Sequence, residues 1–524
     1  MKTLLSAIFL AGALALSLPS HAQTLRWASQ GDPQTMDPHS QNELLTNSIN
    51  GQVYETLVKR DRQLRLVPGL ATAWTQAGPK TWRMTLRRGV KFHDGADFTA
   101  DDVLFSVQRA QLPTSAIQAY ATAMGQPRRV DDFTVEFELP QVNPIFLQHA
   151  SLVFIMNRAW SERNNAAAPL DFKNREVKHT ALNTNGTGPY ILVSRQPDAK
   201  TVFRRNPRYW EPFEGNAQEV VYTPIKSDST RTAALLSGEL DLVLDPVPQD
   251  IDRLRTNPAV KVLDGPENRA VFIGMDQARD ELLNSNVKGR NPFKDVRVRR
   301  ALYHAVNIET LRTNLMRGMA APTGSILPST LGTFGEPEFE KRLPYDPERA
   351  KALLAQAGYP DGFEVTMDCP NNRYINDEEI CIALAAMWGR VGVKVKVNAM
   401  PRALYFAKME KLDTSMYMLG WGGSITDAET TLTPVMRSRG EQGVGYYNWG
   451  NYRNPKLDEL AAASSQEPDP ARRAELIKAA VREHNEQVHH IPLHRQVIPW
   501  AMRKNVDAVH RADNWLEWRW VTVK

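Results

Sequence analysis

Long apolar runs are scarce in this chain of 524 residues. Residues 4–18 form the longest one, and it falls short of the about 20 apolar residues that a membrane-spanning helix needs. Lys2 before the run and Ser20-His21-Ala22 after it are typical of a secretory signal peptide that is cleaved before Gln23. We therefore expect the mature chain in the periplasm. The residue directly after the cleavage site is Gln23 and not a cysteine, so we expect no lipid anchor.

Cysteine is also scarce, with only Cys369 and Cys381 in the chain. In an oxidising compartment two such cysteines can pair. A disulfide would hold residues 370–376 against a helix expected to begin near Asp377, and two buried free thiols are the alternative. No CxxC motif or nearby histidine accompanies them, so the spacing predicts no zinc site.

Strong charge bias and enzyme motifs are missing as well. The formal net charge is only +5, and no basic tract is interleaved with aromatic residues, which argues against a nucleic-acid partner. The chain contains no G-x-S-x-G elbow, P-loop or H-E-x-x-H motif. We therefore expect no enzymatic activity and no cofactor.

About 500 mature residues exceed one ordinary hydrophobic core, so we expect two or more lobes. Helices are predicted from their capping residues at 100–110, 348–357, 471 to about 489, and 307 or 308 to 317. Strands are predicted between them at 80–86, 134–139, 220–223, 271–275, 364–367 and 393–397. This alternation indicates a mixed α/β fold.

An ordered set of motifs runs through the whole mature chain. They are Leu66–Trp74 (LVPGLATAW), Thr81–Gly95 (TWRMTLRRGVKFHDG), Phe98–Val103 (FTADDV), Gly186–Tyr190 (GTGPY), Arg205–Trp210 (RNPRYW), Ser237–Asp241 (SGELD), Phe293–Leu302 (FKDVRVRRAL), Tyr345–Pro347 (YDP), Gly420-Trp421 and Asn454–Asp458 (NPKLD). The set resembles the bacterial extracellular solute-binding proteins of family 5, which serve peptide and nickel ABC transporters. Most of these residues are expected to hold the fold and to touch no ligand; His93-Asp94-Gly95, for example, is typical of a turn.

The resemblance implies a class II (cluster C type) periplasmic binding protein with two lobes and a ligand cleft between them. Lobe I would span residues 23–272 and 495–524, with a subdomain inserted at about 60–185, and lobe II residues 273–494. The expected function is capture of a short peptide or peptide-like solute and its delivery to the ABC permease in the inner membrane. We expect a monomer.

The stretch Gly420–Ser424 is the first candidate for the ligand site. Trp421 offers a flat stacking face, and Gly422 and Gly423 would let backbone approach a ligand. Peptide-binding relatives have an aspartate three residues after this tryptophan, where it pairs with the ligand's ammonium. Here that position is Ser424, which cannot supply the charge. Because this anchor is lost, we predict weak binding of ordinary free-amine dipeptides. Asp427 or Glu429 could take over from a shifted position.

Arg373 is the second candidate, because a guanidinium suits a ligand carboxylate and dipeptide-binding relatives place an arginine in this region. His494 and Gln496 would face the same side of an extended segment at 491–496, and one of them is expected to line the cleft. Arg402 and Tyr405 are weaker candidates, for which core packing or surface exposure is an equal alternative.

Three alternatives remain at this point. A nickel chelate or haem would need ligands such as His484, His489, His490 and His494, but Pro492 breaks the helix that would pair the last two. Scattered packing histidines are therefore the favoured interpretation. A periplasmic chaperone or a secreted hydrolase is less favoured. A transport receptor differs from both by binding one small molecule and leaving it unchanged.

Overall fold

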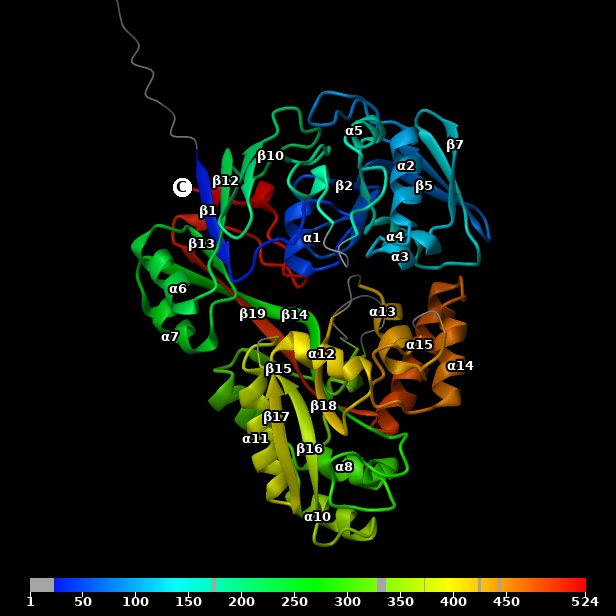
Figure 1. Cartoon of the computed structure of the whole chain (residues 1–524), viewed down its shortest axis with the longest axis vertical. Helices are drawn as coiled ribbons and strands as arrows, with labels where there is room; N and C mark the ends of the chain where they lie inside the picture. Colours follow the sequence, from blue (N-terminus) through cyan, green and yellow to red (C-terminus); the bar gives the residue numbers. More distant parts are fainter. Residues whose placement is uncertain (1–22, 172–175, 328–335, 372, 423–425, 442–443) are drawn as a thin grey trace, which may run out of the picture.

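Two long antiparallel strands, β14 (Val260–Met275) and β19 (His490–Arg503), run through the middle of the molecule and connect its two lobes (Figure 1). The structure is a computed structural model that describes residues 23–171, 176–327, 336–371, 373–422, 426–441 and 444–524. The boundaries predicted between the lobes, at residues 272 and 495, fall within these two strands.

An eleven-stranded sheet extends from β14 and β19 into both lobes. On the lobe I side its strands are β10 (Tyr190–Gln196), β11 (Lys200–Arg205), β12 (Glu219–Pro224), β1 (Thr24–Ser29) and β13 (Leu242–Leu244). On the lobe II side they are β18 (Met416–Trp421), β16 (Phe363–Pro370) and β17 (Val393–Met400), while β15 (Ala320–Pro322) pairs with β19. The sheet is mixed, with parallel pairs such as β1 with β12 and β16 with β17.

A second sheet of four antiparallel strands forms a separate layer at the far side of lobe I (Figure 1). Its strands, in spatial order, are β5 (Ala71–Gly78), β6 (Thr81–Leu86), β8 (Thr134–Glu138) and β7 (Gln126–Asp131). Short pairs complete the strands: β2 (Glu55–Thr56) with β9 (Phe154–Ile155), β3 (Val58–Arg60) with β4 (Leu66–Pro68), and β20 (Val506–Asp507) with β21 (Thr522–Val523).

Helices surround the two sheets. In lobe I they are α1 (Leu44–Asn50), α2 (Ala100–Ala110), α3 (Gln118–Ala123), α4 (Phe146–Ala150), α5 (Arg158–Arg163), α6 (Asp228–Ser237) and α7 (Pro248–Thr256), with short 3-10 turns η1 (His179–Ala181) and η6 (Trp518–Trp520). In lobe II they are α8 (Val296–His304), α9 (Ile308–Thr310), α10 (Pro347–Gln356), α11 (Asp377–Gly389), α12 (Arg402–Glu410), α13 (Glu429–Thr431), α14 (Pro455–Ser464) and α15 (Pro470–Glu486), with 3-10 turns η2 (Pro292–Lys294) and η4 (Pro337–Glu340). Two π-helical turns, η3 (Leu311–Leu315) and η5 (Leu432–Met436), follow α9 and α13. Within the described ranges, no helix is both long and apolar enough to cross a bilayer.

The predicted caps locate most helix starts. Asp102 accepts from the backbone N–H of Thr99 at 3.0 Å at the start of α2, and Asp346 caps α10 by accepting from Arg349 at 2.8 Å. Two predictions needed correction. The last long helix ends at Glu486, because Val488 takes a left-handed φ of 47° and the chain enters β19. The segment from Ile308 becomes a π-helix before it ends.

Separate apolar cores hold the parts together. One core lies under the four-stranded sheet and includes Phe92, Val103 and Phe137. Another lies under β1, β12 and β13 of lobe I, and two more lie in lobe II. Because each part buries its own core, β14 and β19 connect lobes that are each internally packed, which is the arrangement that permits hinge motion.

Candidate functional site

A cavity of about 1950 Å³ lies between the lobes and is lined from both of them. This exceeds the roughly 300–1,000 Å³ of ordinary small-molecule pockets. Its lining residues come from three places: the N-terminal and C-terminal parts of lobe I, the four-stranded subdomain with its helices, and the lobe II segments around β16, β18 and η5. A ligand here would touch both lobes at once.

The end of β18 supplies part of the cavity wall. Trp421 lines the cavity and donates its indole N–H to the carbonyl of Thr430 at 2.7 Å, with its ring 4.6 Å from that of Tyr447. This fixes the ring, so it can offer a face to a ligand but no hydrogen bond. Gly422 passes so close to Asn268 that a Cβ would lie 2.1 Å from its carbonyl oxygen. The predicted residues Gly423 and Ser424 lie outside the described residues.

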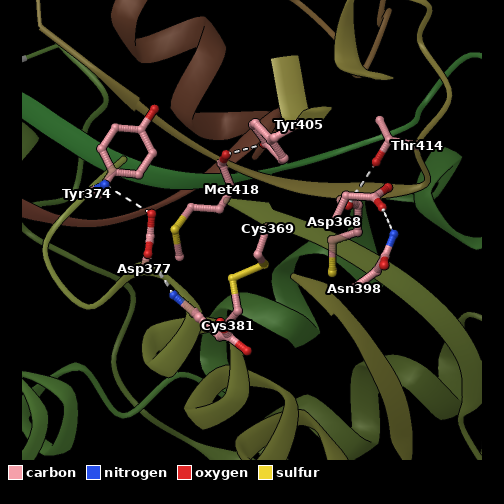
Figure 2. Close-up of a disulfide and its surroundings, with 11 residues drawn as sticks. Asp368, Cys369, Tyr374, Asp377, Cys381, Asn398, Tyr405, Thr414 and Met418 are labelled. Atoms are coloured by element: carbon pink, nitrogen blue, oxygen red, sulfur yellow. Dashed lines mark hydrogen bonds between the residues drawn. A yellow bond between two sulfur atoms is a disulfide. The ribbon is translucent and has the colours of Figure 1, made fainter. Parts of the chain in front are cut away.

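The loop after β16 carries Arg373 into the cavity lining. Asp377, at the start of α11, accepts from the backbone N–H of Arg373 at 2.8 Å. It also accepts from the backbone N–H of Tyr374 at 3.0 Å (Figure 2). The Tyr374 hydroxyl donates to the carbonyl of Gly420 at 3.2 Å, so this loop is joined to β18. The Arg373 guanidinium lies 5.2 Å from the centre of the Tyr374 ring.

Cys369 and Cys381 form a disulfide (Figure 2). This settles the choice between a disulfide and free thiols that the sequence left open. The bond joins the end of β16 to the first turns of α11 and closes the segment that contains Arg373. It therefore restrains the loop that brings the guanidinium to the cavity.

The two acids that could replace the missing aspartate have different surroundings. Asp427 is buried and accepts from both Nη atoms of Arg473, at 2.8 and 2.7 Å. Glu429 lines the cavity, and burial raises its pKa to about 7, although Thr433, Arg473 and Arg437 oppose that rise. Asp427 is thus committed to an internal ion pair, whereas Glu429 faces the cavity.

His494 and Gln496 do not share one environment, although both lie on β19. Gln496 lines the cavity, accepts from the N–H of Ile375 at 3.4 Å and donates to Glu267 at 3.3 Å. His494 is buried away from the cavity lining, and burial lowers its pKa to about 4. Arg342 covers the strand there by donating to the carbonyl of Leu493 at 3.0 Å.

Of the two weaker candidates after β17, only Tyr405 has a side chain that the structure describes. Tyr405 is fully buried and donates its hydroxyl to the carbonyl of Met418, so it belongs to the core of lobe II (Figure 2). It does not line the cavity. The side chain of Arg402 lies outside the described part of the structure.

The sequence did not single out several cavity residues. Arg60, on β3, donates to Thr426 at 3.0 Å and so joins the subdomain to lobe II. Burial lowers the pKa of Arg60 to about 10, and among the described residues no carboxylate lies within 4 Å of it. Asp245 follows β13 with a φ of 55°, and burial raises its pKa to about 6. The sequence did not mark Arg60, because Lys59-Arg60-Asp61-Arg62 is typical of an exposed charged segment.

A paired acid and base complete the floor of the cavity. Arg269 donates to Glu267 at 3.1 Å and to the carbonyl of Gly420 at 3.2 Å. Both residues lie on β14, close to where it pairs with β18 and β19. No motif marked them, because they become neighbours of Gly420 and Gln496 only when β14 lies between β18 and β19.

The family profile of the bacterial extracellular solute-binding proteins, family 5 Middle, matches residues 65–443. That match covers well over half of the chain. The protein belongs to this family. The resemblance that the ordered motifs suggested is therefore correct, and the two lobes with a cavity between them are the family's fold.

This solute-binding protein is similar to several characterised relatives. The di/tripeptide-binding protein 1 of Pseudomonas aeruginosa is 28% identical and the match covers 95% of this chain and 94% of that protein. The glutathione-binding protein GsiB of Escherichia coli K12 is 26% identical, with 91% and 90% covered. The periplasmic binding protein DppA of Helicobacter pylori, solved with the peptide STSA, superposes with a TM-score of 0.78 at 23% identity, covering 95% and 98%.

The histidines that raised a metal alternative form an internal network of the solute-binding protein. His484 Nε2 and His490 Nδ1 share a hydrogen bond of 2.8 Å, and His489 stacks on Tyr452 at 3.8 Å. Burial lowers the pKa of all three, so they are neutral at physiological pH. In the described residues no group of three or more His, Cys, Asp or Glu side chains could hold a metal ion.

Proposed function

We propose that this solute-binding protein captures a short peptide or peptide-like acid and delivers it to the permease of an ABC importer. The observation that carries the proposal is the cavity between the lobes, which is large enough for a peptide and places Arg373 and Trp421 in its lining. The relatives named for di- and tripeptides and for glutathione support the same class of ligand. Delivery to a permease follows from the family's role.

Four of the predicted residues are proposed to contact the ligand directly. Arg373 binds a ligand carboxylate, because a guanidinium presents paired donors that match a carboxylate. Trp421 stacks against the ligand, Gly422 lets backbone approach it, and Gln496 offers an amide at the cavity floor. Gly423 and Ser424 stay in the proposal from the sequence alone. Asp427 and His494 instead stabilise the walls through contacts away from the ligand.

The proposed cycle has two states and no chemical step on the ligand. The open protein admits the solute, the lobes close by bending at β14 and β19, and the permease recognises the closed form. ATP hydrolysis belongs to the transporter. We propose that the protein is a monomer that acts in the periplasm after residues 1–22 are removed, and that it has no enzymatic activity.

Native mass spectrometry of the protein purified from a periplasm tests this function. The intact complex is weighed, then denatured, and any released molecule is identified. One peptide-like molecule per chain is the expected result. A released haem or nickel complex would replace the proposal with the metal-chelate alternative, and a long unfolded chain would point to a chaperone.

A substitution at Arg373 tests its role in ligand binding. We expect Arg373→Ala to weaken binding of the released ligand by about tenfold or more, because a charge-assisted hydrogen bond is lost. The matched control is Arg390→Ala, an exposed arginine at the other end of α11. Isothermal titration calorimetry compares the two. Equal affinity of Arg373→Ala and the unmodified protein would refute the assignment.

A further inference from the structure

Asp245 lines the cavity from lobe I, directly after β13, and its side chain stays partly exposed there. Its φ of 55° is left-handed, although a residue before a proline, here Pro246, normally takes an extended conformation. Left-handed backbone at a residue other than glycine is strained and is concentrated at functional sites. The fold around Asp245 therefore maintains a strained conformation in the cavity wall.

Two neutral groups fix the orientation of the Asp245 carboxylate. Asn514 donates from Nδ2 to Oδ1 at 3.3 Å, and the Ser29 side chain forms a second hydrogen bond. The indole N–H of Trp500 donates to Oδ1 of Asn514 at 2.7 Å. Because an indole nitrogen can only donate, the amide oxygen of Asn514 must face Trp500, and its NH₂ group must face Asp245. These contacts position the carboxylate and leave its charge uncompensated.

Among the residues that the structure describes, no arginine, lysine or histidine forms an ion pair with the Asp245 carboxylate. Arg231 donates to the backbone carbonyl of Asp245 at 3.3 Å, but its guanidinium is paired with Asp228 at 2.5 Å. Burial and the nearby charge of Glu267 raise the pKa of Asp245 to about 6, so a cation would stabilise the ionised form. Other acids of the cavity wall have such a cation: Asp32 pairs with Arg195, Glu267 with Arg269 and Asp513 with Arg511.

Glu429, in the lobe II wall, is less suited to a cation than Asp245. It hydrogen-bonds with Thr433, and the positive charges of Arg473 and Arg437 act on it. A cationic group of a ligand would be repelled by both guanidinium groups there. Asp245 in lobe I is thus the better candidate for a positive group that enters the cavity.

The Asp245 segment faces the Arg373 loop across the cleft. Helix α7 begins soon after Asp245, and its residue Gln249 donates to Oδ1 of Asn376 at 3.3 Å. Asn376 lies at the end of the Arg373 loop, where α11 of lobe II begins (Figure 1). The cavity therefore has a carboxylate without a paired cation in lobe I and a guanidinium in the facing part of lobe II.

We propose that Asp245 binds the ammonium of the ligand from lobe I, while Arg373 binds its carboxylate from lobe II. The ligand then joins the two lobes through its own two charges. A ligand shifts the equilibrium between open and closed forms only as far as it binds the closed form more tightly. A ligand without the ammonium should therefore close the lobes less. The inference deepens the proposed function and rests on it.

Alanine peptides of two to five residues test the assignment, each in the free form and with an acetylated N-terminus. Acetylation removes the ammonium and keeps the carboxylate. Calorimetry on the mature protein, refolded with its disulfide intact to remove any carried ligand, measures both affinities. For the length that binds most tightly, we expect the free form to bind about tenfold or more tightly, because acetylation removes a charge-assisted hydrogen bond.

Substitutions at Asp245 locate that preference. Asp245→Asn keeps the shape of the side chain and tolerates a left-handed φ, and Asp245→Gly removes the strain together with the side chain. Both should weaken binding of the free peptide about tenfold or more and change that of the acetylated peptide less than about twofold. The matched control is Asp252→Asn, an exposed acid on α7. Melting temperatures show whether each variant is folded.

Small-angle X-ray scattering tests whether the ligand joins the lobes. At saturation we expect the free peptide to reduce the radius of gyration more than the acetylated peptide does. In Asp245→Asn both peptides should give the same radius, because neither forms an ion pair in lobe I. Equal radii with both peptides on the unmodified protein would overturn the proposal that the ligand's charges join the lobes.

Failure of this inference can be told apart from failure of the proposed function. Equal affinity for free and acetylated peptides of every length would overturn the role of Asp245. A preference that survives both substitutions would also overturn it, as would the failure of every peptide to bind. Equal weakening of both peptide forms by the substitutions would make Asp245 a structural residue. In each case the molecule released in native mass spectrometry still decides whether the protein is a peptide receptor.

Discussion

Asp427 shows how one contact decides a residue's role. Its carboxylate is buried and bonded to Arg473 through two hydrogen bonds. Removing one partner of such a pair leaves a buried charge without compensation, so Asp427→Asn should lower the free energy of unfolding by about 3–5 kcal/mol. The exposed Asp252→Asn is the control. Urea denaturation measures both, and unchanged stability with lost ligand binding would make Asp427 a ligand group instead.

Single residues were partly predictable from the sequence. The residue types and the resemblance to peptide-binding proteins pointed to Arg373 and Trp421, and both line the cavity. Arg60 and Glu267 could not be found, because nothing in their local sequence differs from a surface charge. Their place in the cavity depends on the neighbours that the tertiary fold supplies.

At the scale of elements, the disulfide couples β16 to α11 around the Arg373 loop. Replacing both cysteines with serine should lower the free energy of unfolding by about 3 kcal/mol, because a loop of this length gains freedom in the unfolded chain. Ligand affinity should also fall, because the Arg373 loop would be less preorganised. Denaturation and calorimetry check these effects. A reductant should reproduce them in the native protein and have no effect on the serine variant.

The elements themselves followed from local signals where caps and alternation were strong. Helix α10 begins after its Asp346 cap and ends before Gly358, whose φ is 85°. The π-turns η3 and η5 were not predictable, since no local signal in the sequence marks an extra residue in a turn. That matters for the site, because Thr433 and Pro434 of η5 line the cavity.

At the scale of the whole molecule, buried neutral histidines should make stability depend on pH. Burial lowers the pKa of His93, His149, His484 and His494 to about 4 in the folded protein, below the 6.5 of an exposed histidine. The unfolded chain therefore binds more protons between about pH 6.5 and 4, and stability falls as pH drops through that range. Full stability is present above pH 6.5.

One variant isolates a single histidine. The His494 imidazole binds one proton when the chain unfolds between pH 6.5 and 4, and His494→Leu removes that group. The slope of the free energy of unfolding against pH should therefore flatten by about 1.4 kcal/mol per pH unit in this range. Urea denaturation at several pH values measures the slope. The variant His304→Leu, at a partly exposed histidine, should leave the slope unchanged, since no buried histidine is removed. An unchanged slope in His494→Leu would show that His494 is protonated in the folded protein.

The central claim is that the lobes close around a peptide-like solute. Because Cys369 and Cys381 are joined, cysteines introduced at the exposed positions Val130 on β7 and Ile382 on α11 can carry spin labels, one in each lobe (Figure 1). Double electron–electron resonance then measures the distance between labels with and without the ligand released from the purified protein. The account predicts a shorter mean distance when the ligand binds. Identical distance distributions, with binding shown by calorimetry, would contradict it.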